Sequence, residues 1–218
     1  MTDWVTISAL ATAGGTLVLA VATFSSVRSA NRAARTAEQA ARTAERSFQV
    51  ALRPVLFPSR PDDPPMKIRW GDNHWAHVDG GRALVDEVDG AIYLAMSLRN
   101  VGAGIAVIQG WLAGPEERGR ELERPDPAGF HTQVRDLYVP AGDSAFWQAG
   151  IREPGHPSRA GVEQGIQVKF LIIDILYSDH EGGQRTISRF SAAEPTGGGS
   201  SWLCSVIRHW NLDRTHPR

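Results

Sequence analysis

The sequence predicts a mainly β protein that carries a membrane-spanning helix near its N-terminus. Three observations support this fold class. An uncharged, apolar run occupies residues 4–24, and a segment rich in Ala and Arg, without Gly or Pro, follows it as far as residue 53. The remaining chain alternates apolar and polar residues with the two-residue period of β-strands, and Gly and Pro punctuate the alternating stretches as they do at turns.

The overall composition excludes several classes of protein. The chain has 218 residues, with 23 Lys and Arg against 24 Asp and Glu, and its 42% of apolar residues is too high for a disordered chain. A single cysteine, Cys204, excludes a disulfide framework and a Cys-rich zinc module. The net charge of −1 gives no reason to expect a nucleic-acid partner. We therefore expect one globular domain with an appendage.

Residues 4–25 are predicted to form a transmembrane helix. The apolar stretch from Trp4 to Phe24 has 21 residues, and a helix of that length spans about 31 Å, close to the hydrocarbon core of a bilayer. A cleaved signal peptide and a buried helix of a soluble protein are the alternatives. The first requires a positive region before the apolar run, and residues 1–3 contain no Lys or Arg. The uninterrupted apolar length disfavours the second.

The charges that flank this helix predict its orientation. Asp3 is the only charged side chain before it, whereas Arg28, Arg32 and Arg35 follow it closely. By the positive-inside rule, residues 1–3 then form an extracytoplasmic N-terminus and the following domain is cytoplasmic. The expected location is the inner (plasma) membrane, with the lipid bilayer as the first partner.

Residues 26–53 are predicted to form a stalk helix below the membrane. The segment has six Arg and two Glu, a net charge of +4, and it contains a seven-residue repeat at 34–40 and 41–47. Ala occupies almost all of one helical seam. A parallel coiled coil through this seam, aided by small residues in the span, would make the protein a homo-oligomer. The alternative is a single helix whose Ala stripe rests on its own domain.

Residues 54–192 are predicted to form an antiparallel, immunoglobulin-like β-sandwich, with a closed barrel as the alternative. The clearest strands are 91–100, 105–114 and 165–179, and a hairpin turn at 180–183 follows the last of them. Shorter candidate strands lie at 66–70, 74–78, 83–88, 133–139, 144–150 and 184–192.

Two loops and the C-terminal segment complete the predicted domain organisation. The loops 113–129 and 152–164 are long, charged and rich in Pro, and loops of this kind are the most promising places for binding. Residues 193–201 are predicted to be a Gly/Ser linker, and residues 202–218 a short C-terminal helix and tail. That helix would pack on the sandwich or, alternatively, lie at the membrane interface, because one helical face carries Leu203, Val206, Ile207 and Trp210.

Three short motifs add a resemblance. They are RP at 53–54, LRNVGAGIA at 98–106 and RHWNLDR at 208–214. With the span and the stalk, they resemble actinobacterial single-pass membrane proteins of a family of unknown function, in which a cytoplasmic β-sandwich follows the membrane helix. The resemblance implies location and architecture, and it assigns no catalytic residue.

Two polar clusters are the candidate sites for an enzyme. His74, His77 and Asp79 lie close in sequence, but a spacing of three residues puts the two His on opposite faces of a strand, which suits one metal ion poorly. Asp179 and His180 lie in the predicted hairpin turn, where an Asp is already explained by turn preferences. The sequence contains no phosphate-binding, G-x-S-x-G or H-E-x-x-H motif. We therefore expect no catalytic, cofactor-binding or metal-binding residue.

Individual residues carry three further expectations. Asp174 interrupts an apolar strand, so it should lie at an edge or pair with an arginine, with a catalytic acid as the alternative. Cys204 is expected to be a small apolar residue rather than a nucleophile. Asn100, Gly102 and Gly104 are expected to supply turn chemistry, with positive φ at the glycines and side-chain-to-backbone hydrogen bonds from the asparagine.

The sequence thus favours a membrane-anchored cytoplasmic interaction or scaffold protein that binds an unknown cytoplasmic protein. The alternative is a hydrolase-like or metal-dependent enzyme that uses His74, His77 and Asp79, or Asp179 and His180.

Overall fold

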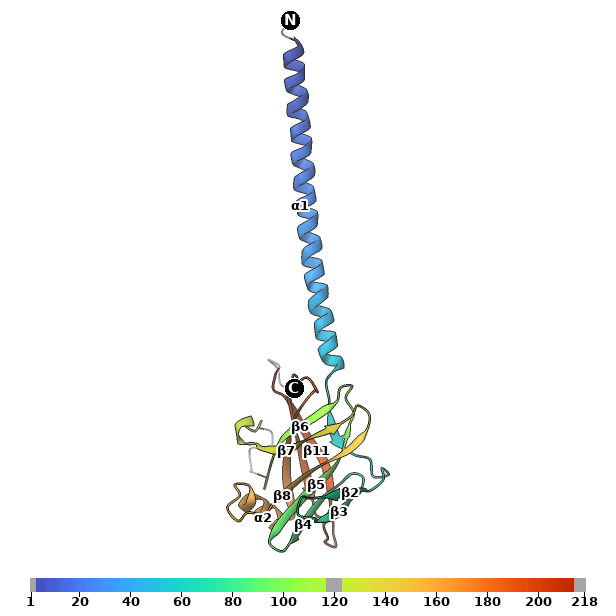
Figure 1. Cartoon of the computed structure of the whole chain (residues 1–218), viewed down its shortest axis with the longest axis vertical. Coiled ribbons are helices and arrows are strands. Elements are labelled where there is room, and N and C mark those ends of the chain that lie inside the picture. Colours follow the sequence, from blue (N-terminus) through green and yellow to red (C-terminus); the bar gives the residue numbers. More distant parts are fainter. Residues whose placement is uncertain (1–2, 117–122, 214–218) are drawn as a thin grey trace. The chain divides into compact units, whose positions relative to one another are not determined.

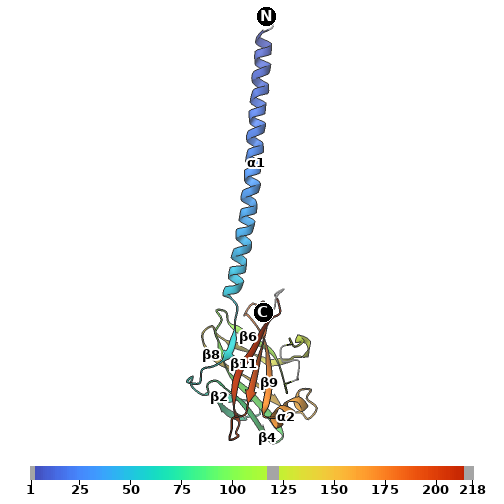
Figure 2. The same cartoon turned by 180° about the vertical axis from the view of Figure 1, so that it is seen from behind.

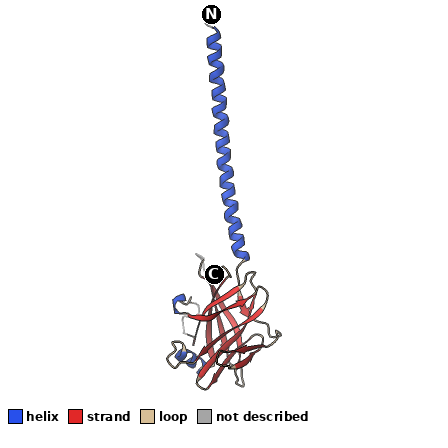
Figure 3. Ribbon diagram, viewed as in Figure 1, coloured by secondary structure: helices blue, strands red, loops and turns tan. Residues whose placement is uncertain are grey.

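A computed structural model of the chain describes residues 3–116 and 123–213 (Figure 1). The chain divides into two compact units, residues 1–50 and residues 51–218. The first unit is helical and the second consists mostly of strands, as the colouring of Figure 3 shows. The predicted mainly β class, with a long apolar helix near the N-terminus, is therefore confirmed.

Helix α1 (Asp3–Ala51) runs without a break through both the predicted span and the predicted stalk. It ends shortly before Pro54, which cannot continue a helix and disfavours helical geometry in the residue before it. Among the described residues, α1 is the one helix long and apolar enough to cross a membrane. The hydroxyls of Thr12, Thr16 and Thr23 donate to carbonyls four residues earlier, so these polar groups are satisfied within the helix, as lipid requires.

Nine strands of the second unit form one antiparallel sheet. The spatial order is β1-β5-β4-β11-β10-β9-β6-β7, and β8 also pairs with β5 (Figure 1, Figure 2). The strands are β1 (Leu56–Pro58), β4 (Arg82–Val88), β5 (Ala91–Asn100), β6 (Ala106–Gly114), β7 (His131–Val139), β8 (Ser144–Ile151), β9 (Phe170–Ser178), β10 (Thr186–Ala193) and β11 (Ser201–Asn211).

The sheet curls around its core until β7 and β8 approach one another. Gln133 Nε2 of β7 donates to the Gln148 carbonyl of β8 across 3.1 Å. The core inside the curl contains the fully buried side chains of Trp147, Tyr177 and Phe190. The predicted immunoglobulin-like sandwich is not confirmed, because the nine strands belong to one sheet and not to two stacked ones.

A separate two-stranded sheet, β2 (Met66–Arg69) and β3 (Trp75–Val78), packs against β4 and β5. Its apolar side chains join residues of β4 and β5 that point away from the main core, and together they form a second, smaller core. This explains why β5 is buried on both faces and not only on one. The members of the smaller core are Ile68, Trp70, Val78, Leu84, Tyr93 and Ala95.

The predicted C-terminal helix is wrong, because residues 201–211 form strand β11. Trp202, Cys204 and Val206 point toward the core in the alternation of a strand. A β-bulge then places Val206 opposite Phe190 and Arg208 opposite Arg189, so Ile207 is an extra residue. This extra residue shifts the alternation and makes the apolar spacing resemble that of a helix. Strand β11 pairs with β10 over most of its length and with β4 over residues 201–203, so backbone groups that a short helix would bond internally are bonded to neighbouring strands.

The predicted linker and the start of one predicted strand are also corrected. Residues 194–200 form the hairpin loop between β10 and β11, in which Gly197, Gly198 and Gly199 all have positive φ. Residues 165–167, predicted as the start of a strand, belong to helix α2 (Arg159–Gln167), and strand β9 begins only at Phe170. Val162 of α2 is fully buried in the main core, so tertiary packing holds a short helix in the predicted loop.

The LRNVGAG motif binds the segment through which the chain enters the β domain. Asn100 is fully buried, and its Oδ1 accepts from the backbone N–H groups of Val55 (3.1 Å) and Gly102 (3.0 Å). Its Nδ2 donates to the carbonyls of Gly104 (2.6 Å) and Val139 (3.0 Å). The expected side-chain-to-backbone hydrogen bonds of Asn100 are therefore confirmed.

The two glycines of this motif serve a purpose that differs from the expected one. Neither Gly102 nor Gly104 has a positive φ. A Cβ added at Gly104 would overlap the carbonyl of Leu52, and one added at Gly102 would overlap the carbonyl of Arg53. Glycine is needed here because two backbone segments pass too close together for any side chain.

Candidate functional site

A cavity of about 600 Å³ lies over strands β6, β9, β10 and β11, beside the N-terminal end of α2. Pockets that bind small molecules have volumes of roughly 300–1,000 Å³. Both loops that the sequence marked for binding contribute to its wall, the first through residues 113–116, 123–126 and 129, and the second through residues 157, 158 and 161. Strand residues form its floor.

The floor contains a buried ion pair between neighbouring strands. Asp174 of β9 lies directly opposite Arg189 of β10. The guanidinium donates from Nε and Nη2 to the two carboxylate oxygens at 2.9 Å each, and the two side chains are only 3% and 11% exposed. Arg189 also lies over the ring of Trp210, 5.1 Å from its centroid. The expectation that Asp174 pairs with an arginine is confirmed.

Burial and pairing act in opposite directions on the carboxyl group of Asp174. Removal from water raises its pKa, because a low-dielectric interior disfavours the charged form, and the two hydrogen bonds from Arg189 oppose that rise. The pair therefore gives the floor of the cavity no net charge while both groups are ionised.

The wall next to α2 holds a serine and a histidine in close contact. His131 Nε2, from the first residue of β7, lies 2.6 Å from Ser158 Oγ. Ser158 immediately precedes α2, yet its hydroxyl makes no capping hydrogen bond to the helix. Both residues line the cavity. A capping serine would accept a hydrogen bond from the helix backbone. The hydroxyl of Ser158 interacts with the imidazole of His131 instead.

A second histidine and a tryptophan hold this pair in position. The backbone N–H of Ser158 donates to His156 Nδ1 at 3.2 Å. The His156 ring stacks on Trp111 with an interplanar angle of 2°, and the His131 ring contacts both of them, with centroids 4.6 Å and 5.0 Å away. Burial lowers the pKa of His131, and the nearby His156 lowers it further. The His131 imidazole is therefore neutral at pH 7.

The first cluster that the sequence singled out does not come together. The ring of His74 stacks on Tyr93 with centroids 3.9 Å apart, whereas His77 is exposed on β3. Asp79 is exposed and is 3.5 Å from Ser201 Oγ. Among the described residues, no group of three or more His, Cys, Asp or Glu is placed to hold a metal ion.

His74 belongs instead to a polar network beside the small β2–β3 sheet. Asp72 accepts from the hydroxyl of Tyr93 and from Nε of Arg152, each at 2.6 Å. These two bonds hold the pKa of Asp72 well below its usual range, with the Arg152 bond as the larger cause. The network connects the turn before β3 to β5 and to the end of β8.

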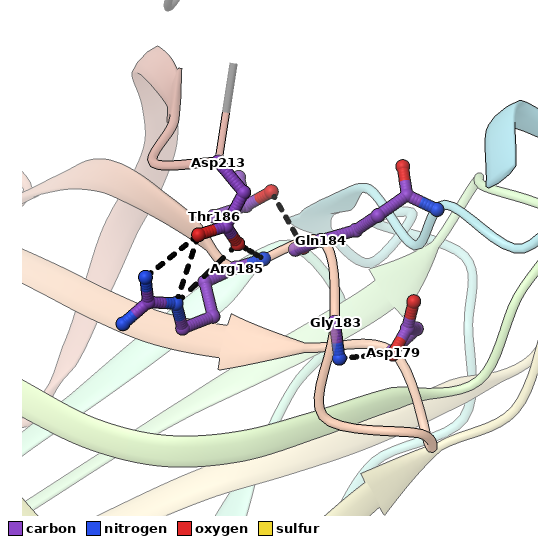
Figure 4. Close-up of polar contacts among 6 residues, drawn as sticks. All are labelled: Asp179, Gly183, Gln184, Arg185, Thr186 and Asp213. Carbon is purple, nitrogen blue, oxygen red and sulfur yellow. Dashed lines mark hydrogen bonds and ion pairs between the residues drawn. The ribbon is translucent and has the colours of Figure 1, made fainter. Parts of the chain in front are cut away.

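The second cluster is part of a turn (Figure 4). Asp179 is buried, and its Oδ1 accepts from the backbone N–H groups of Gly183 (2.8 Å) and Glu181 (3.2 Å), while His180 is exposed. Next to this loop, Arg185 donates to Asp213 and connects the start of β10 to the end of β11 (Figure 4). The carboxylate of Asp179 therefore shapes the hairpin, as turn preferences indicate.

Cys204 is a structural residue with a half-buried side chain. Its side chain packs against the main core, and burial raises the pKa of its thiol to about 12. The thiolate, which is the nucleophilic form, is therefore negligible at neutral pH. The expectation that Cys204 is not a nucleophile agrees with this environment.

Sequence patterns pointed to only part of the cavity. Arg189 could have been found, because continuing the hairpin register outward from the turn at 180–183 pairs it with Asp174. Ser158 and His131 carry no local signal, because no spacing rule connects a strand residue to a serine before a helix far along the chain.

Comparison of the chain with protein families and curated proteins identified no relative. No protein-family model matches the chain, and no curated protein matches it. The resemblance to actinobacterial single-pass membrane proteins therefore stays a prediction.

Proposed function

We propose that the protein is a single-pass protein of the plasma membrane whose β domain lies in the cytoplasm and binds another protein. Helix α1 carries this proposal, because an apolar stretch long enough to cross a bilayer continues without a break into a helix rich in Arg. The positive charges lie on the side of the β domain, which is the cytoplasmic side under the positive-inside rule.

A reporter fused after Arg218 tests the location and the orientation. We expect green fluorescent protein at this position to fluoresce and alkaline phosphatase to be inactive, with the chain remaining in membranes after carbonate washing. Exchange of Arg28, Arg32 and Arg35 for Gln should raise the phosphatase signal, because it removes the nearest cytoplasmic charges. Active phosphatase on the unmodified chain would contradict the orientation.

The surface around the cavity supports binding of a protein partner. Leu203 and Ile207 of β11 are 50% and 39% exposed, and Ile207 also lines the cavity. Contiguous exposed apolar surface marks interaction sites, and Ile207 extends the apolar part of the cavity lining to the exposed face of β11. We propose that the partner contacts this region through an apolar segment.

Substitutions at two open glycines test the binding region. A Cβ at Gly114, in the cavity wall, or at Gly71, in the β2–β3 turn, meets no atom within 4 Å. We expect Gly114→Trp to abolish recovery of the partner in pull-downs from native membranes, because the indole fills the cavity, and Gly71→Trp to leave recovery unchanged. Equal recovery with both variants would place the partner elsewhere.

Self-association is a further part of the proposal. The Ala stripe at positions 30, 34, 37, 41 and 44 is exposed on α1. We propose that two copies meet along this stripe below the membrane, because anchoring in a shared bilayer raises their effective concentration enough to offset the small area that Ala buries.

A further inference from the structure

We propose that Ser158 and His131 act as nucleophile and general base in a hydrolytic site of the cavity, and that the substrate is an uncharged carboxylic ester with an apolar acyl chain. This activity is additional to anchoring and partner binding, and it does not depend on either of them.

The contact between the two side chains is the first argument. The distance of 2.6 Å from His131 Nε2 to Ser158 Oγ is within the range for a base that takes a proton from a hydroxyl. A serine before a helix ordinarily caps it, but this one makes no such bond, so its oxygen is free to act on a bound molecule. Both residues line a cavity large enough for a small substrate.

The state of the base is the second argument. Burial and the neighbouring His156 favour the neutral imidazole, which is the form that accepts a proton. Trp111 and His156 contact the ring of His131 and fix its orientation. The charged groups that line the cavity around it are Glu116, Glu123, Arg124, Asp126, Asp174 and Arg189.

The start of α2 supplies a place for the negative charge that develops on the ester oxygen. The first N–H groups of an α-helix have no acceptor within the helix and lie at its positive end. Those of Ala160 and Gly161 lie two and three residues after Ser158, and Gly161 lines the cavity. Two backbone donors beside a nucleophile form the kind of arrangement that stabilises a tetrahedral intermediate.

The lining of the cavity indicates the substrate class. Leu112, Ile172 and Ile207 contribute apolar side chains that suit an acyl chain. The carboxylates of Glu116, Glu123 and Asp126 also line it, and they disfavour an anionic substrate. An ester with an uncharged alcohol part fits both features.

The reaction proceeds in two steps with water as co-reactant. Ser158 Oγ attacks the ester carbonyl while its proton moves to His131 Nε2, and the alcohol leaves with that proton, so an acyl-serine forms. Water then attacks the acyl-serine, His131 accepts its proton and returns it to Ser158 Oγ, and the carboxylic acid is released.

A fluorophosphonate probe tests the nucleophile on the full chain in detergent micelles. We expect a covalent adduct, with loss of fluoride, at Ser158 of the unmodified chain by peptide mass spectrometry. Ser158→Ala should lose it, and Ser205→Ala, at an exposed serine of β11, should keep it. A folded chain without an adduct at Ser158 would overturn the proposal and leave the contact with His131 a structural one.

Hydrolysis of p-nitrophenyl butyrate tests the base. We expect a burst of p-nitrophenol equal to the amount of chain, and a rate that rises with pH to a plateau with an apparent pKa below the usual 6.5 of histidine. His131→Gln should lower the rate about 100-fold or more. A rate that is unchanged in His131→Gln would overturn the role of His131 as base. Failure of the reporter or pull-down experiments would leave these readouts unaffected.

Discussion

Replacement of Arg189 by alanine is expected to lower the free energy of unfolding of the β domain by about 3–5 kcal/mol. The substitution leaves the carboxylate of Asp174, 3% exposed, without the guanidinium that donates two hydrogen bonds to it. It also removes a side chain that packs over Trp210. Urea unfolding of the detergent-solubilised chain, followed by tryptophan fluorescence, measures the loss.

A double variant separates the ion pair from packing. Asp174→Leu combined with Arg189→Met should unfold within about 1–2 kcal/mol of the unmodified chain, because replacing both members with apolar groups leaves no buried charge. The loss in Arg189→Ala should shrink as the pH falls toward 4. Without the hydrogen bonds and the charge of Arg189, burial raises the pKa of Asp174 further in the variant, so its folded state takes up a proton as the pH falls and regains part of the lost stability. A loss below about 1 kcal/mol at pH 8 would contradict this account.

Replacement of Asn100 by alanine is the second large effect, with an expected loss of about 3 kcal/mol. The buried amide makes hydrogen bonds with four backbone groups, and each buried polar group left unpaired costs about 1–3 kcal/mol. Water that enters the space left by the side chain can bond some of these groups, so the total loss is smaller than the sum. Asn100→Asp should not restore the stability, because a carboxylate cannot donate to the carbonyls of Gly104 and Val139.

Proteolysis tests which part of the chain becomes less stable in Asn100→Ala. One of the four bonds holds Val55, so we expect Asn100→Ala to expose Leu52 to cleavage by chymotrypsin under conditions in which the unmodified chain resists. Asn31→Ala, at an exposed position of α1, is the control and should change neither unfolding nor cleavage. Equal cleavage of the two variants would show that Asn100 does not restrain this segment.

Local periodicity predicted the elements whose burial follows from their own residues. Strand β5 has the predicted bounds, 91–100, because its core-facing side chains alternate without interruption. The burial of Tyr93 and Ala95 on the other face was not predictable from that alternation, since it depends on the small β2–β3 sheet, which packs there from another part of the chain.

Two errors have physical causes that lie outside any single segment. Strand β11 was predicted as a helix because the extra residue Ile207 shifts the alternation, and a bulge is defined only relative to a partner strand. Helix α2 was predicted as loop and strand because it is short, and its stability comes from the burial of Val162 in the core.

The residues of the candidate site also fall into two groups, those that local sequence patterns indicated and those that only the fold brings together. Asp174 was noticed as a misplaced charge within a strand, and its partner follows from the register of a hairpin. His131 and Ser158 meet only because β7 and α2 are brought together by the curled sheet. A contact between such distant residues depends on the whole fold, so it could not be deduced from spacing along the chain.

The position of β11 in the sheet determines when the sheet can be completed during synthesis of the chain. This strand lies between β4 and β10, yet it is the last strand of the described chain to leave the ribosome. Helix α1 and strands β4 and β5, which pair with each other, are made long before β4 gains β11 as its second neighbour. Any chain truncated before Ser201 would leave the edges of β4 and β10 unpaired, and exposed edges of this kind promote aggregation. Premature termination near the C-terminus should therefore yield a chain whose β domain cannot close.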